Sequence, residues 1–301
     1  MNFSNFFIPF LVVFCLTPLV RKSALALKIT DKADGDPLKI HNAPVALLGG
    51  VVIFLGFLIG LLAHRQVLTI WARALLTISG GGTLLLIIGV WDDIKPLSPG
   101  IRIVFQIGAG LLLFLGGIHL ECTPVIFIGV VFTILYVIGA VNAFNLVDGM
   151  DGLCAAMFLI SSIGFFIIGV QETNRLLVIL SGTLAMSVLG FLPYNLHPAR
   201  IFLGDGGSGF LGFMCAVMAI ISISPYSTGM RFLTSLMILG IPVLDMAAAI
   251  LRRAVARKHL FMGDRSHLYD FLLKKKMTQF QVWSIMCILQ LIVVAVGIAI
   301  R

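Results

Sequence analysis

The chain has 301 residues, of which 59% are hydrophobic and only 11% are charged, and its mean hydropathy is +1.10. Soluble domains carry roughly 25% charged residues, so this composition excludes a mainly water-exposed surface and indicates a chain covered by a lipid bilayer. The formal net charge of +8 does not point to nucleic acid, because no basic stripe follows a soluble face.

Apolar segments long enough, or nearly long enough, to cross a bilayer follow one another along the whole chain. They lie at about 3–20, 44–63, 70–90, 101–118, 123–141, 153–170, 175–192, 208–223, 231–250 and 280–300. A membrane helix needs about 20 mainly apolar residues. The sequence therefore predicts an all-α, polytopic integral membrane protein with about ten transmembrane helices, forming one domain over residues 1–301.

The polar connections between these segments differ in charge on the two sides. Sixteen of the 21 Lys and Arg residues fall in one set of loops and five in the other, so the first set is predicted to be cytoplasmic and both termini to lie outside. Eleven aspartates share the basic side, whereas only Glu121 and Glu172 lie opposite. The positive-inside rule says little about acids. A metal-dependent active site on the cytoplasmic face would explain this asymmetry.

The first polar motifs in chain order are the segment Lys39–Pro44 and the pair Asp92 and Asp93 at the end of the third span. The Lys39 segment alone is a weak signal, since basic groups at an inner boundary usually extend toward the headgroups. Adjacent carboxylates at a membrane boundary repel each other and lose hydration, which a cation or a proton relieves. A solvated loop pair is the alternative, because Lys95 follows at once.

A second motif places polar residues at every third position of an apolar stretch, namely Asn142, Asn145, Asp148 and Asp151. Spacing of three keeps side chains on one slowly turning stripe of a helix. Oxygen ligands next to glycines suit a hard divalent cation such as Mg²⁺, or a nucleotide. An ordinary polar turn capped by Asn and Asp is the alternative.

A third motif, the glycine-rich run at 202–209, opens the eighth span around Asp205. A glycine-rich turn at a helix N-terminus exposes N–H groups and can seat a phosphate. No Lys follows the glycines, so the run is not a P-loop. Asp205 would hold a metal that bridges phosphates, and a helix cap with flexible glycines is the alternative.

The basic connection 252–276 contains Arg265 and His267 within three residues. An arginine fork beside an imidazole suits a pyrophosphate. Topology and contact with anionic lipid headgroups account for the charges of this connection as a group.

Together these motifs resemble the polyprenyl-phosphate N-acetylhexosamine-1-phosphate transferase family, from Lys39 to about Asp270. The resemblance implies that N-acetylhexosamine-1-phosphate, with GlcNAc-1-phosphate the leading choice, moves from a UDP-sugar to undecaprenyl phosphate with release of UMP. This step starts cell-envelope glycan synthesis at the prokaryotic plasma (inner) membrane. The cofactor implied is Mg²⁺, with Mn²⁺ as an alternative, and a homodimer is an option.

The resemblance also implies roles for individual residues. Asp92, Asp93 and His267 match catalytic positions, and Asn145 and Asp205 match positions that hold Mg²⁺. Matches to substrate-binding positions are Lys39, Asp148, Asp151, Asn195, Phe202 and Arg265, of which Asp151, Asn195 and Phe202 line the uridine pocket. Tyr269 and Asp270 stand where family members often carry further histidines, which argues against the peptidoglycan-precursor branch.

Several alternatives stay open at this point. A secondary transporter also carries intramembrane acids, although here only Asp245 looks buried within a span, and a catalytically inactive scaffold is a third class. Within the enzyme hypothesis, Asp92 acts either as a base or as an orienting group. Direct attack by the lipid phosphate is the main mechanism, and a covalent aspartyl-phosphate intermediate is the minor one.

Overall fold

The computed structural model describes residues 3–31, 44–121, 125–223, 229–256 and 267–301, and nearly all regular structure within them is helical. The helices are η1 (Phe3–Phe6), α1 (Phe7–Ala26), α2 (Gly49–Ala63), α3 (Arg65–Ile70), α4 (Ala72–Ile94), α5 (Pro99–Leu115), α6 (Ile126–Val147), α7 (Leu153–Gln171), α8 (Arg175–Asn195), α9 (Gly204–Ile223), α10 (Gly229–Leu239), α11 (Ile241–Val255), α12 (Leu268–Lys274) and α13 (Gln279–Ala299). Two short strands, β1 (Thr30–Asp31) and β2 (Val45–Ala46), pair antiparallel. The all-α prediction is confirmed.

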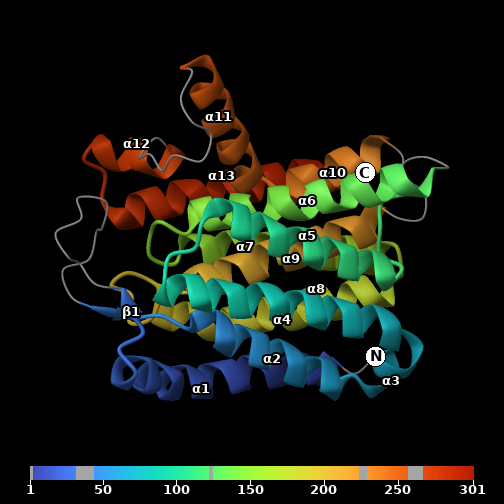
Figure 1. The fold of residues 1–301 in the computed structure, drawn as a ribbon, viewed down its shortest axis with the longest axis horizontal. Coiled ribbons are helices and arrows are strands. Elements are labelled where there is room, and N and C mark those ends of the chain that lie inside the picture. The colour runs from blue at the N-terminus through green and yellow to red at the C-terminus, as the bar shows by residue number, and fades with distance from the viewer. Residues whose placement is uncertain (1–2, 32–43, 122–124, 224–228, 257–266) are drawn as a thin grey trace.

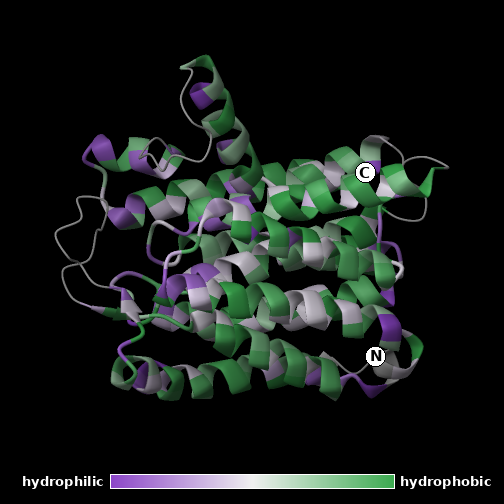
Figure 2. Ribbon diagram, in the orientation of Figure 1, coloured by the Kyte–Doolittle hydropathy of each residue, from purple (hydrophilic) through white to green (hydrophobic). Residues whose placement is uncertain are grey.

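The long helices run side by side as a bundle, apolar along their middles and more polar toward the ends (Figures 1 and 2). Within the described residues, seven helices are long and apolar enough to cross a membrane, namely α1, α4, α6, α7, α8, α9 and α13. The helices α10 and α11 form a pair bent by 90°, and α2 and α5 are shorter apolar helices. Each of the ten predicted apolar segments thus overlaps at least one helix of the described residues, and the prediction of a multi-pass membrane protein is confirmed.

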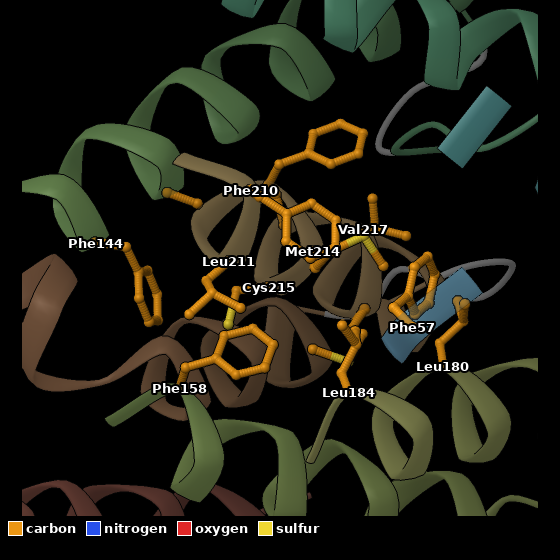
Figure 3. Close-up of a cluster of buried hydrophobic side chains, with 14 of the residues drawn as sticks. Phe57, Phe144, Phe158, Leu180, Leu184, Phe210, Leu211, Met214, Cys215 and Val217 are labelled. Carbon is orange, nitrogen blue, oxygen red and sulfur yellow. The ribbon is translucent and has the colours of Figure 1, made fainter. Parts of the chain in front are cut away.

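The helix α9 forms the centre of the bundle. It packs against α2, α4, α6, α7 and α10, and Figure 3 shows its side chains Phe210, Leu211 and Met214 among large apolar groups of the neighbouring helices. A helix that is apolar on every side is buried on every side. The surrounding helices therefore fix where the first turn of α9, which carries Asp205, lies at one end of the bundle.

Glycines allow this first turn to approach its neighbours at backbone distance. A Cβ added to Gly89 of α4 would overlap the backbone of Gly206, and one added to Gly50 of α2 would overlap Gly207. Gly206 and Gly207 of the 202–209 motif therefore serve close helix packing. Close packing is thus a role that neither the phosphate-seat hypothesis nor the flexible-cap alternative named.

Substitution of Gly89 by Ala is expected to destabilise the fold by about 1–3 kcal/mol, because the new methyl group must push α4 away from α9. Thermal unfolding of the purified protein in detergent measures the effect. Gly100→Ala in α5 is the matched control, since no atom of the described residues lies within 4 Å of a Cβ at Gly100. Equal unfolding temperatures for both variants would contradict the proposed close contact.

The break between α10 and α11 is held by a single side chain of α13. Gly240 has φ of +64°, and at this point the amide oxygen of Gln290 accepts the N–H of Ile241 at 2.8 Å. The amide nitrogen of Gln290 donates to Ser161 Oγ at 2.9 Å and to the carbonyl of Ile238 at 3.2 Å. A broken helix in a bilayer needs such partners for its freed backbone groups. The sequence did not predict this arrangement.

Candidate active site

A cavity of about 350 Å³ opens at the end of the bundle where β1 lies, away from the end where α1 begins and α13 terminates (Figure 1). Its walls come from β1, the end of α4, the α6–α7 turn and the connection between α8 and α9. The described lining residues are Thr30, Asp31, Leu47, Asp93, Asn145, Asp148, Gly149, Met150, Asp151, Asn195, Phe202, Gly204 and Asp205. Segments far apart in sequence thus meet in one hollow.

Three side chains predicted to act on the phosphates converge in this cavity. The N–H of Asp205 donates to Asp93 Oδ1 at 2.9 Å, so Asp93 caps the N-terminus of α9. Asn145 Nδ2 donates to Asp205 Oδ1 at 2.8 Å. Among the described residues, Asp93 Oδ2 is buried without a hydrogen-bond partner. The prediction that Asp93, Asn145 and Asp205 share one cavity is confirmed, while their chemical roles stay predictions.

The cavity concentrates negative charge. Five of its 13 described lining residues are aspartates and none of the 13 is basic. Burial, together with the carboxylates of Asp205, Asp93 and Asp151, raises the pKa of Asp148 well above its ordinary value. Such a group of carboxylates repels itself and would repel an anionic substrate. A bound cation relieves both effects.

The donor set fits a hard cation that keeps part of its own solvent shell. The partnerless Asp93 Oδ2 and the carboxylate of Asp205 are oxygen donors of the kind that Mg²⁺ prefers. In the described part of the chain, no group of three or more His, Cys, Asp or Glu residues could hold a metal by itself. Mg²⁺ usually binds through one or two carboxylates plus water and substrate phosphates, so this donor set suffices.

Asp92 faces a second, smaller cavity of about 40 Å³ on the other side of Asn145 and Asp205. Asp92 Oδ1 accepts the N–H of Leu97 at 2.7 Å, and Asp92 Oδ2 lies 2.5 Å from Arg102 Nε. Arg102 Nη1 is also 3.7 Å from Asp205 Oδ2. In the sequence analysis, Arg102 contributes only to the count of basic residues that predicts the cytoplasmic side. The signal that could have indicated a contact with Asp92 is its position ten residues later, at the start of α5.

The prediction that one helical stripe carries the polar residues from Asn142 to Asp151 is wrong beyond Val147, where α6 ends. Asn142 does not line the 350 Å³ cavity; it lines the smaller one, where its Nδ2 donates to Gln106 Oε1 at 2.9 Å. The chain then turns through Gly152, whose φ of +69° is readily adopted only by glycine. The turn places Asp148 and Asp151 on the cavity wall by a route other than helical periodicity.

The turn and the connection between α8 and α9 hold each other in place. Asp151 Oδ2 lies 2.8 Å from His197 Nδ1 and accepts the N–H of Ala199 at 3.1 Å. Asn195 Nδ2 donates to the carbonyl of Ile201 at 2.9 Å, and the N–H of Phe202 donates to the carbonyl of Ala46 at 2.8 Å. Asp151, Asn195 and Phe202 therefore line the same cavity, while their predicted role in a uridine pocket stays a prediction.

Sequence reasoning also missed the opposite wall, which Asp31 and Leu47 help to form. Asp31 was counted among the cytoplasmic acids, but no motif singled it out. Its place follows from the pairing of Asp31 with Val45, which brings β1 beside the start of α2. Pairing between two-residue strands leaves no periodic signal in a sequence.

His267 does not line the aspartate cavity. It caps α12 and lies beside Asp245 of α11, with 2.8 Å between His267 Nδ1 and Asp245 Oδ2. Both residues line a separate cavity of about 540 Å³ that also includes Arg252 and Lys274. A catalytic role for His267 stays a prediction. The predicted substrate-binding residues Lys39 and Arg265 lie outside the described residues.

Comparison with known proteins adds a family to this geometry. The model of glycosyl transferase family 4 matches residues 75–223. The probable undecaprenyl-phosphate N-acetylglucosaminyl 1-phosphate transferase of Bacillus subtilis is 30% identical to the chain, covering 89% of it and 76% of the relative. The undecaprenyl-phosphate alpha-N-acetylglucosaminyl 1-phosphate transferase of Thermotoga maritima is 30% identical, over 88% of the chain and 80% of the relative. The decaprenyl-phosphate N-acetylglucosaminephosphotransferase of Mycobacterium tuberculosis is 30% identical (78% and 67%).

Proposed function

The chain belongs to glycosyl transferase family 4, and on that premise we propose that it transfers GlcNAc-1-phosphate from UDP-GlcNAc to undecaprenyl phosphate and releases UMP. The names of its relatives support the lipid acceptor and the sugar. The convergence of Asp93, Asn145 and Asp205 on one acidic cavity carries the proposal, because transfer between phosphates depends on charge neutralisation and alignment.

The proposed topology has ten crossings, counting α2, α5 and the bent α10–α11 pair together with the seven long helices. An even number agrees with α1 beginning and α13 ending at the same end of the bundle (Figure 1). The excess of Lys and Arg on the cavity side supports a cytoplasmic active site in the bacterial plasma membrane, with both termini outside.

Asp93, Asp205 and Asn145 would hold Mg²⁺, or Mn²⁺ in its place. When bound, the metal supplies positive charge to the diphosphate and favours departure of UMP. Asp148, Asp151, Asn195 and Phe202 form the wall against which the uridine part would bind.

The lipid phosphate would attack the sugar-bearing phosphorus directly, since a phosphate monoester with a second pKa near about 6 is already mostly ionised at neutral pH. Both oxygens of Asp92 contact partners within the protein, Leu97 and Arg102. Asp92 therefore orients Arg102 in this scheme, and Arg102, which lines the small cavity, would face the phosphates from there.

The expected result is UMP release by the detergent-purified protein that requires UDP-GlcNAc, undecaprenyl phosphate and Mg²⁺ together. Chelation by EDTA should abolish release, and added Mg²⁺ or Mn²⁺ should restore it, because the acidic cavity would otherwise repel the diphosphate. A panel of UDP-sugars in the same assay tests the choice of GlcNAc. Absence of UMP release under all these conditions would overturn the proposed reaction and favour a transporter.

A further inference from the structure

The Asp148–Gly152 turn supplies four of the residues that line the aspartate cavity, yet the turn is held from behind by the C-terminal part of the chain. Trp283 of α13 donates its indole N–H to the carbonyl of Gly152 at 3.2 Å. Tyr269 of α12 places its hydroxyl against Gly149, where a Cβ would overlap the phenol oxygen. Neither aromatic residue lines the cavity itself.

Apolar packing reinforces these two contacts. Met150, at the middle of the turn, is 5% exposed and belongs to a small buried cluster with Tyr269, Val282 and Met286. The side chain of Met150 thus anchors the turn to α12 and α13, while the aspartates on either side of it face the cavity. A shift of α12 or α13 would therefore displace the cavity wall.

The helix α12 is in turn fixed to α11. Asp245 accepts the N–H of Leu268 at 3.0 Å through Oδ1, and its Oδ2 lies 2.8 Å from His267 Nδ1. The His267 ring stacks on the Tyr269 ring, with centroids 5.8 Å apart and planes 7° apart. A continuous chain of contacts thus runs from Asp245 to the cavity wall at Gly149.

We propose that Tyr269 and Trp283 are positioning residues for the nucleotide-sugar donor. They hold the Asp148–Gly152 turn in the conformation that the donor binds. The inference rests on the proposed function, because it takes the aspartate cavity to be the donor site. According to this proposal, the affinity for the donor depends on contacts made by α12 and α13, whereas the affinity for the lipid acceptor does not.

Tyr269→Phe and Trp283→Phe test the proposal, since each removes a polar group behind the wall and keeps an aromatic ring. Each is expected to raise the KM for UDP-GlcNAc, and the Kd of UMP measured by calorimetry in Mg²⁺, by about three- to tenfold. Trp283→Phe loses the hydrogen bond to the carbonyl of Gly152, and Tyr269→Phe loses the contact of its hydroxyl with Gly149. The KM for undecaprenyl phosphate should stay unchanged, and kcat should change by less than about twofold.

Two control variants separate positioning from general loss of stability. Tyr136→Phe removes a hydroxyl that contacts Ser235 Oγ at 3.2 Å between α6 and α10. Ser284→Ala, next to Trp283, removes a hydroxyl that donates to the carbonyl of Phe280 in its own helix. Both should leave the Kd of UMP unchanged, whatever their unfolding temperatures.

The outcomes distinguish this proposal from the one on which it rests. A wild-type protein that neither binds UMP nor releases it would refute the proposed function. A wild-type protein that binds UMP, with Tyr269→Phe and Trp283→Phe binding it equally well, would refute the positioning role alone. Lower unfolding temperatures in these two variants with an unchanged Kd would show a purely structural role and refute it as well.

Discussion

Asp205→Asn is expected to lower Mg²⁺-dependent UMP release by about 10³-fold while the protein stays folded. The substituted amide keeps an oxygen that can accept the hydrogen bond from Asn145, seen at 2.8 Å, so the geometry of the site should survive. The change removes one negative charge at the point where both cavities meet. The measurement is initial rate against Mg²⁺ concentration, with unfolding temperature recorded in parallel.

Glu172→Gln is the matched control for this charge change. Glu172 is a carboxylate at the other end of the bundle, where Glu172 Oε1 lies 3.1 Å from Arg231 Nη2 and 2.8 Å from Arg301 Nε. Its loss should affect stability and leave turnover per folded molecule unchanged. An Asp205→Asn protein with more than about a tenth of wild-type activity would remove Asp205 from the proposed metal site.

Gln290→Met is expected to lower the free energy of unfolding by about 2–4 kcal/mol, the largest effect on stability foreseen here. Methionine preserves the length of the side chain but offers no partner to the N–H of Ile241 or to Ser161 Oγ. An unpaired buried N–H costs about 1–3 kcal/mol, and no water is present in a bilayer core to replace the lost partner. Unfolding in mixed micelles measures the total.

Hydrogen exchange adds a local measurement to this prediction. The amide of Ile241 should exchange faster in Gln290→Met than in the wild-type protein, because its acceptor is gone. Ser187→Ala is the control, since the hydroxyl of Ser187 donates to the carbonyl of Thr183 in its own helix, at 2.9 Å. An unchanged unfolding free energy in Gln290→Met would show that the break at Gly240 is stable without Gln290.

The helices and much of the acidic site could be predicted from the sequence, because both leave local signals. Apolar runs of about 20 residues mark membrane helices, and adjacent or regularly spaced acids such as Asp92, Asp93 and Asp205 stand out in such an apolar chain. Two features of the helices differed: α2 and α5 are shorter than a full span, and the predicted segment 231–250 is broken between α10 and α11.

The remaining features depend on contacts between distant segments. The role of Arg102 depends on its contact with Asp92, whose Oδ2 lies 2.5 Å from Arg102 Nε. The role of Gln290 depends on its hydrogen bond at the helix break at Gly240, 50 residues earlier in the chain. The stripe from Asn142 to Asp151 failed because spacing by three continues beyond Val147 although the helix does not. A composition or period argument cannot identify partners that only folding brings together.

The burial of α9 on all sides has a mechanical consequence for the enzyme. Every residue from Gly206 to Ile220 is enclosed by other helices, so this stretch of the helix that carries Asp205 is shielded from acyl chains. Swelling or thinning of the surrounding bilayer reaches that carboxylate only by first deforming an outer ring of helices. A reaction centre at Asp205 would thereby be shielded from the lipid in which the polyprenyl phosphate acceptor dissolves.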